Sequence, residues 1–98
     1  MRIQIAPAIH PGEILREEYL APLGMSAGAL AKKLLVPRTR IERIVAETNP
    51  ITSDTALRLS KFFSTTPQFW LNMQIAYDLT QQLPALADEL EKIEVRAA

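Results

Sequence analysis

The chain has no cysteine and a single histidine, His10. Without cysteine it forms no disulfide and offers no thiolate as a metal ligand or nucleophile, and one histidine leaves few zinc sites or general-base schemes. Phosphate-binding glycine loops and Ser/His/Asp sets are also missing. We therefore expect a protein that is not an enzyme, with no catalytic residues, no metal, no cofactor and no small-molecule substrate.

Long hydrophobic runs are missing as well. No stretch approaches the roughly 18–20 apolar residues of a membrane span, and the first residues lack the apolar core of a signal peptide. We therefore expect a cytoplasmic protein that does not contact a membrane. The 98 residues, 48% of them hydrophobic, suffice for one small domain.

The chain also lacks a net charge, because 11 basic residues balance 11 acidic ones. The charges are nevertheless unevenly distributed. Residues 25–63 carry seven Lys and Arg against three Asp and Glu, whereas residues 64–98 carry two against five. A basic middle beside an acidic tail predicts two surfaces with different partners.

Glycine and proline divide the chain into helical segments, and no convincing strand pattern occurs. The first helix is expected to begin at Pro11 and to end before Pro22. Ser26 is expected to cap a second helix, residues 38–46 to form a third, Thr52 or Ser53 to cap a fourth and Thr65-Thr66-Pro67 to begin a fifth. Pro84 is expected to kink the fifth helix or begin a sixth. The prediction is an all-α fold of five to six helices.

Two short helices joined by about three residues, the second of them basic, have the spacing of a DNA-reading helix-turn-helix. At 100° per residue, Thr39 and Arg43 lie opposite the apolar residues of the third helix, with Arg40 beside them and Arg38 at its N-terminus. Arginine contacts guanine bidentately and threonine contacts base edges or the thymine methyl. Ser26 is expected to place the second helix's N–H groups against a phosphate.

The fifth helix is apolar on nearly all sides, which indicates burial on more than one side. A second protomer would supply the additional cover. The residues predicted to form this dimer contact are Phe69, Trp70, Met73 and Tyr77, together with the segment that follows them. A two-fold dimer also sets two recognition helices about one turn of DNA apart, matching a palindromic site.

Several segments resemble the Cro/C1 (XRE) helix-turn-helix family, and within it the HigA antitoxins of the virulence-associated protein I type. These segments are residues 9–20, Leu30-Ala-Lys-Lys-Leu34, residues 51–59 and residues 66–79, which begin Thr-Pro-Gln-Phe-Trp-Leu-Asn. The resemblance implies a lambda-repressor-like domain, a homodimer, binding to a double-stranded DNA operator, repression of the antitoxin's own operon and neutralisation of a RelE-like (HigB-type) RNase toxin.

Carried over by position, the family's base-reading residues fall on Arg38, Thr39 and Arg43, with Arg40 adjacent. Its phosphate contacts fall on Ser26, Ala27, Thr48 and Asn49. The chain departs from the family where repressors often have glutamine, at Ala27, and where they usually have glycine in the turn, at Leu35. Since leucine does not adopt a positive φ freely, that turn is expected to be strained or differently shaped.

The expected layout is an N-terminal arm over residues 1–8, a DNA-binding domain with its dimerisation helix over 9–80, and a helical tail over 81–98. The tail's acidic residues, Asp88, Glu89, Glu91 and Glu94, suit either a basic toxin or a solvated surface. Two alternatives remain open. The chain could be a stand-alone XRE-type regulator, or an interaction adaptor without specific DNA binding, in which Arg43 would be functionally silent.

Overall fold

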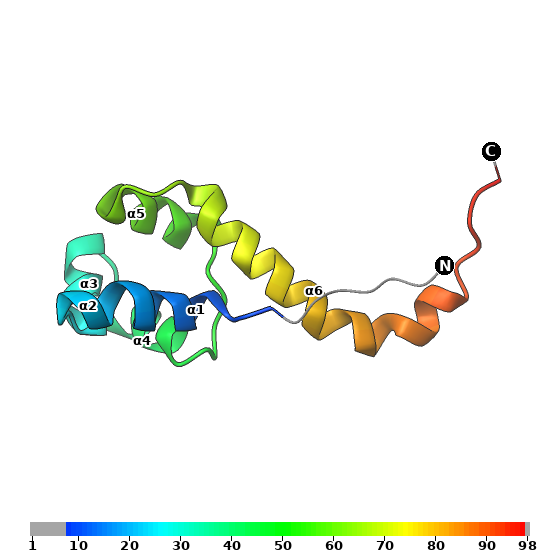
Figure 1. The fold of residues 1–98 in the computed structure, drawn as a ribbon, viewed down its shortest axis with the longest axis horizontal. Helices are drawn as coiled ribbons and strands as arrows, with labels where there is room; N and C mark the ends of the chain where they lie inside the picture. Colours follow the sequence, from blue (N-terminus) through cyan, green and yellow to red (C-terminus); the bar gives the residue numbers. More distant parts are fainter. Residues whose placement is uncertain (1–7, 98) are drawn as a thin grey trace.

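A computed structural model describes residues 8–97, and all regular structure in that part of the chain is helical (Figure 1). The elements are α1 (Pro11–Ile14), η1 (Leu15–Leu20), α2 (Ala21–Leu23), α3 (Ala27–Leu34), α4 (Arg38–Val45), α5 (Ser53–Phe63) and α6 (Pro67–Glu91). Because α1, η1 and α2 follow one another without a break, they form one continuous first helix. The predicted all-α fold is thus confirmed, with five continuous helices. Residues 1–7 of the expected arm and Ala98 of the expected tail lie outside the described residues.

The first helix does not stop before Pro22, so that prediction is wrong. Its middle section, η1, is a π-helix, in which the Ala21 N–H donates to the carbonyl of Arg16, five residues back. A proline inside an α-helix clashes with the carbonyl four residues earlier. The wider π turn just before Pro22 relieves that conflict, and the helix continues to Leu23.

Side-chain caps start the later helices where the sequence indicated. The hydroxyls of Ser26, Thr52 and Thr66 each accept a hydrogen bond from the backbone N–H group three residues later in the chain. The distances are 3.1, 3.4 and 3.2 Å respectively. Each cap satisfies a donor that the helix itself leaves unpaired. The structure also chooses Thr52 over Ser53 as the cap of α5.

The core lies between the first helix, α3, α4, α5 and the first half of α6. Each of these elements contributes buried apolar side chains: Leu15, Leu20, Leu30, Ala31, Leu34, Ile41, Ile44, Ala56, Leu59 and Trp70, with Ile51 from the α4–α5 connection. Trp70 is 0% exposed and its indole N–H donates to the Thr65 hydroxyl at 2.8 Å. One chain therefore covers this tryptophan completely.

The His-Pro-Gly entry of the first helix fits closely against α4 and α6. The Nδ1 atom of buried His10 accepts a hydrogen bond from the Gly12 N–H at 2.9 Å, and its ring packs edge-on against Tyr77 of α6. A Cβ atom on Gly12 would overlap the carbonyl of Ile44. Only glycine therefore allows the first helix to lie this close to the end of α4.

Helix α6 is longer than the body it packs on, and its second half extends away from the other helices (Figure 1). It is continuous through Pro84, so the expected boundary at residues 80/81 falls inside a helix and no sixth helix begins there. The axis bends in this part of α6 in Figure 1, as expected where proline removes a backbone hydrogen bond. In residues 8–97, no helix combines the length and the apolar character that crossing a bilayer requires.

Candidate nucleic-acid interface

The outer face of α4 carries the residues predicted to read DNA. Ile41 and Ile44 point into the core, while Arg38, Thr39 and Arg43 are exposed on the other side. Within residues 8–97, Arg43 has no carboxylate within ion-pair distance, whereas Arg38 pairs with Glu42 at 3.5 Å. The guanidinium of Arg43 is therefore available to an external acceptor.

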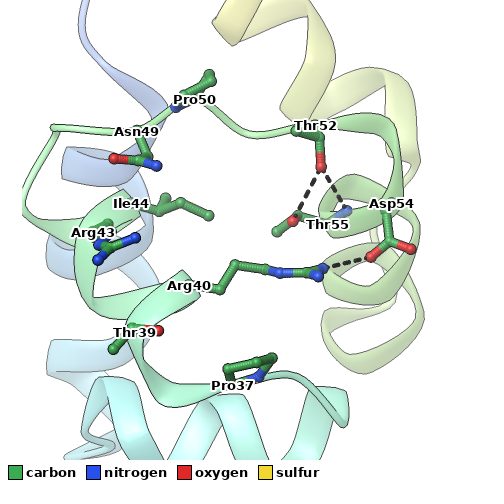
Figure 2. A pocket seen from close by; sticks show the side chains of 10 residues that line it. All are labelled: Pro37, Thr39, Arg40, Arg43, Ile44, Asn49, Pro50, Thr52, Asp54 and Thr55. Carbon is green, nitrogen blue, oxygen red and sulfur yellow. Dashed lines mark hydrogen bonds and ion pairs between the residues drawn. The ribbon is translucent and has the colours of Figure 1, made fainter.

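A groove of about 570 Å³ lies between α4 and the beginning of α5. Thr39, Arg40 and Arg43 form its α4 side, and Thr52, Asp54 and Thr55 form its α5 side. Figure 2 shows Asn49 near the same groove, at the end where the α4–α5 connection begins. The fold thus brings four predicted contact residues, Thr39, Arg40, Arg43 and Asn49, to one surface.

The turn after α4 is built on the carbonyl of Arg43. That oxygen accepts from the backbone N–H groups of Thr48 and Asn49, at 3.0 and 3.3 Å, and from the Thr48 hydroxyl at 3.0 Å. Across the same turn, Arg16 of the first helix donates to the Val45 carbonyl and pairs with Glu47 at 3.2 Å. The two predicted phosphate-contacting residues of this turn are therefore held rigidly beside α4.

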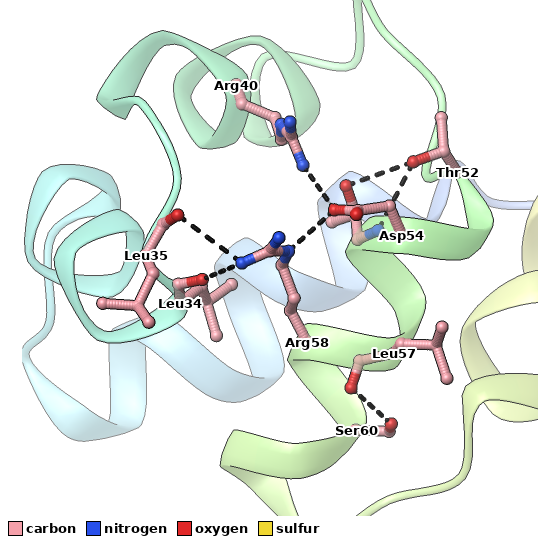
Figure 3. Close-up of polar contacts among 9 residues, drawn as sticks. Leu34, Leu35, Arg40, Thr52, Asp54, Leu57, Arg58 and Ser60 are labelled. Carbon is pink, nitrogen blue, oxygen red and sulfur yellow. Dashed lines mark hydrogen bonds and ion pairs between the residues drawn. The ribbon is translucent and has the colours of Figure 1, made fainter.

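Asp54 connects the recognition helix to the rest of the body (Figure 3). Its Oδ1 atom accepts from Nη1 of Arg40 and from Nε of Arg58, both at 2.7 Å. Arg58 continues the chain of contacts by donating to the carbonyl of Leu34, at the end of α3, at 2.8 Å. The hydrogen bond from Arg58, followed by the one from Arg40, holds the pKa of Asp54 below its ordinary value.

The turn between α3 and α4 places Leu35 at φ 61° and ψ 44°, in the left-handed region. The expected strain at this departure from the family pattern is thus present. The Leu35 side chain is 84% exposed, so packing within the chain gives little in return. The hydrogen bond from Arg58 to the neighbouring carbonyl of Leu34 holds the turn from outside.

The N-terminus of α3 lies next to the start of α4. The Ser26 hydroxyl is occupied as the helix cap, and the Ala27 methyl offers no hydrogen bond. A Cβ on Gly28 would come within 3.0 Å of the Arg38 side chain, so the aliphatic part of Arg38 lies over this glycine. Ser26 and Ala27 as phosphate contacts remain predictions, resting on the backbone N–H groups of the helix end.

The four predicted dimer residues differ in how far their own chain covers them. The prediction that Trp70 contacts a second protomer is wrong, because its own chain buries this side chain completely. Met73 and Tyr77 are half-buried, and Tyr77 packs on His10. Phe69 alone of the four keeps substantial exposure, at 38%. The sequence predicted that a second protomer covers apolar side chains of this helix, and the body of the same chain covers much of that surface.

Asp54 and Arg58 were counted in the charge balance but not assigned to the site. Their i, i+4 spacing on α5 is a signal of an ion pair, yet it does not indicate that Arg40 joins them. Within residues 8–97, no group of three or more His, Cys, Asp or Glu side chains is placed to hold a metal ion. Apart from Asp54, the polar groups of the site are arginine, threonine and asparagine side chains and backbone N–H groups, which suit phosphates and base edges.

A tight pair of helices with an exposed arginine-bearing second helix defines a helix-turn-helix protein, and comparison with known proteins agrees. The helix-turn-helix family model matches residues 15–70. Virulence-associated protein I of Dichelobacter nodosus is 66% identical over 73 residues, which cover 74% of this chain and 68% of that protein. The chain therefore belongs to the helix-turn-helix family, in the group that contains virulence-associated protein I and the HigA antitoxins.

Two solved structures extend the likeness to nearly the whole chain. The Pseudomonas aeruginosa antitoxin HigA, solved with the higBA promoter, has a TM-score of 0.86 and 40% identity, covering 91% of this chain and 98% of that one. The antitoxin GraA, solved in complex with its operator, has a TM-score of 0.91 and 40% identity, with complete coverage of both chains.

Proposed function

We propose that this chain is an operator-binding antitoxin that represses its own operon as a homodimer and neutralises a RelE-like RNase toxin. The observation that carries the DNA-binding role is the outer face of α4. Arg43 is exposed there without an internal carboxylate partner in residues 8–97, one helical turn from Thr39 and beside the groove. The relatives that bind a promoter or an operator support the same role.

In this proposal Arg43, Thr39 and Arg38 read base edges in the major groove. Asn49, Thr48 and the N–H groups at Ser26 and Ala27 contact phosphates on either side. Phosphate contacts set the register and supply salt-dependent affinity, while the arginine and threonine contacts select the sequence. The helix-turn-helix family is a family of DNA-binding proteins and not a class of enzymes.

The test compares wild-type protein with Arg43→Ala on its own upstream DNA and on a scrambled duplex. Losing a base-reading arginine should reduce operator affinity by about 5- to 150-fold, equivalent to roughly 1–3 kcal/mol, and should affect the scrambled duplex much less. Arg96→Ala, which removes the same charge from the C-terminal segment, is the matched control and should change little. If Arg43→Ala left operator affinity intact, the adaptor alternative would replace this proposal.

The dimer contact is proposed to lie in the outer half of α6. Leu79, Leu83, Leu86 and Leu90 recur at spacings of four, three and four residues, the repeat of a helix that pairs with another helix. Three of them, Leu79, Leu86 and Leu90, are exposed, at 50%, 45% and 38%. A stripe of this kind is costly in water and is removed by pairing with the same stripe of a second chain.

The toxin contact is proposed to use the acidic residues of the same region. Asp88 lies roughly opposite the leucine stripe at 100° per residue, so dimerisation would leave its side of α6 accessible. An RNase needs positive surface for RNA, which favours an acidic antitoxin surface. Replacing Asp88 and Glu91 with lysine should weaken binding of the purified toxin, and an unchanged affinity would place the toxin contact elsewhere. If no toxin binds the wild-type chain, the stand-alone regulator is the better description.

A further inference from the structure

The three arginines of α4 differ in how much of their charge DNA can use. Arg43 has no carboxylate partner in the described residues, and Arg38 has a loose one in Glu42, at 3.5 Å, with 72% of the Arg38 side chain exposed. Arg40 is held at 2.7 Å by Asp54, a residue of another helix. Its position on α4 suits a DNA contact, but its side chain reaches across the groove to Asp54 of α5 (Figure 2).

Asp54 is held on both sides. The same Oδ1 atom accepts from Arg40 and from Arg58, and Arg58 is anchored in turn on the carbonyl of Leu34. Figure 3 shows this continuous path from the recognition helix through α5 to the end of α3. Because Arg58 is fixed at its other end, the carboxylate has a defined position and fixes Arg40 in turn.

Asp54 also places a negative charge in the wall of the groove, on the surface that the proposed function turns toward phosphates. A carboxylate there neutralises Arg40 and repels the DNA backbone. Both effects reduce the sequence-independent part of DNA affinity, which depends on the number of cations that reach phosphates. Neither effect removes the base contacts available to Arg43 and Thr39.

We propose that Asp54 is a specificity-determining residue of the DNA interface, which holds Arg40 across the groove and withholds its charge from phosphates. The inference rests on the proposed operator-binding function and adds a residue to it. Asp54 contacts no base in this scheme. It lowers affinity for DNA of any sequence and so widens the gap between operator and non-operator DNA.

The test is Asp54→Asn, measured on the chain's own upstream DNA and on a scrambled duplex across a range of salt concentrations. Releasing Arg40 should make the plot of log K against log salt on the scrambled duplex steeper by about 0.9 for each bound protomer, the value of one added phosphate contact, and should raise affinity there by about five- to tenfold per protomer at 0.1 M salt. Operator affinity should rise less, so the ratio between the two duplexes should fall.

Two further variants separate this role from a general charge effect. Glu18→Gln removes one negative charge from an exposed residue of the first helix that has no ion-pair partner in residues 8–97, and should leave the salt slope unchanged. In an Arg40→Gln background, Asp54→Asn should no longer steepen the slope, because the cation it releases is missing. An unchanged slope for Asp54→Asn, or an equal change with and without Arg40, would overturn the proposal. So would equal weakening on both duplexes together with a lower melting temperature, since that indicates a purely structural ion pair.

The outcome is distinguishable from failure of the proposed function. The proposed function depends on whether wild-type protein prefers its own upstream DNA to the scrambled duplex. The role of Asp54 depends on the difference between Asp54→Asn and wild type on the scrambled duplex alone. A wild type without sequence preference would therefore refute the operator role while still giving a result for the salt slope.

Discussion

The surface around α4 and the outer half of α6 expose opposite kinds of side chain. Around α4 the exposed groups are charged, and Arg40, Asp54 and Arg58 hold one another by contacts within the chain. Along the outer half of α6 the exposed groups include three leucines of the stripe, Leu79, Leu86 and Leu90, which are 38–50% exposed. The body completes its own core and presents a charged surface around α4, whereas in the proposed dimer the leucine stripe of α6 is covered by the same stripe of a second chain.

The largest effect is expected when the leucine stripe of α6 is made charged, like the surface around α4. Leu86→Glu combined with Leu90→Glu puts negative charge into the leucine stripe and should convert the dimer to a monomer. Operator affinity should then fall on the order of 100-fold or more, because two half-sites are no longer bound by one linked pair. Analytical ultracentrifugation and operator binding measure the two effects.

The matched control is Asp88→Asn, on the opposite side of α6, which should remain dimeric. Helical content should be retained in both proteins, since the body does not depend on residues 86 and 90. A dimer that persists with both glutamates in place would move the interface to another part of the chain.

Gly12→Ala tests the close packing of the body. The added Cβ would overlap the Ile44 carbonyl, so the first helix must move away from α4, at a cost of about 1–3 kcal/mol in the free energy of unfolding. Urea denaturation measures it. Gly28→Ala is the control, because there the new methyl meets only the flexible side chain of Arg38; a comparable loss in both variants would contradict the close approach at Gly12.

Leu35→Gly should stabilise the body. Glycine adopts φ near 60° without strain, and the exposed Leu35 side chain forfeits little packing. After the added flexibility of the unfolded chain is subtracted, a gain of about 1 kcal/mol is expected in urea denaturation. Leu35→Ala keeps the positive φ of a residue with a side chain and should give no such gain. Equal stabilities for Leu35→Gly and Leu35→Ala would show that the turn carries no strain.

Of these changes, lowering the pH is expected to have the smallest effect on stability. Because Arg58 and Arg40 lower the pKa of Asp54 in the folded chain, its contribution to stability is complete above the ordinary value of 3.8 and is lost as the pH falls through the lower folded value. The urea midpoint of wild type should therefore fall below about pH 4 more steeply than that of Asp54→Asn. Parallel curves for the two proteins would show that the ion pairs of Asp54 do not contribute to stability.

Local chemistry could be predicted from the sequence to a large extent. The caps at Ser26, Thr52 and Thr66, the basic third helix and the outward positions of Thr39 and Arg43 all follow from residue types within one or two helical turns. The strain at Leu35 could also be expected, because a non-glycine residue occupies a turn that usually needs a positive φ. The extent of the first helix was not predicted, because proline normally ends an α-helix, and the π turn before Pro22 lets this helix continue to Leu23.

The sequence by itself therefore determined an all-helical chain with a DNA-reading helix pair, because helix caps, apolar spacing and turn residues act locally. Only the tertiary structure decided which residues meet across distance. It buried Trp70 inside one chain, joined Arg40 to Asp54 and Arg58 from another helix, and left the leucines of α6 exposed. Such contacts depend on how five helices pack around one core, and no spacing along the chain encodes which charged side chains of different helices face each other.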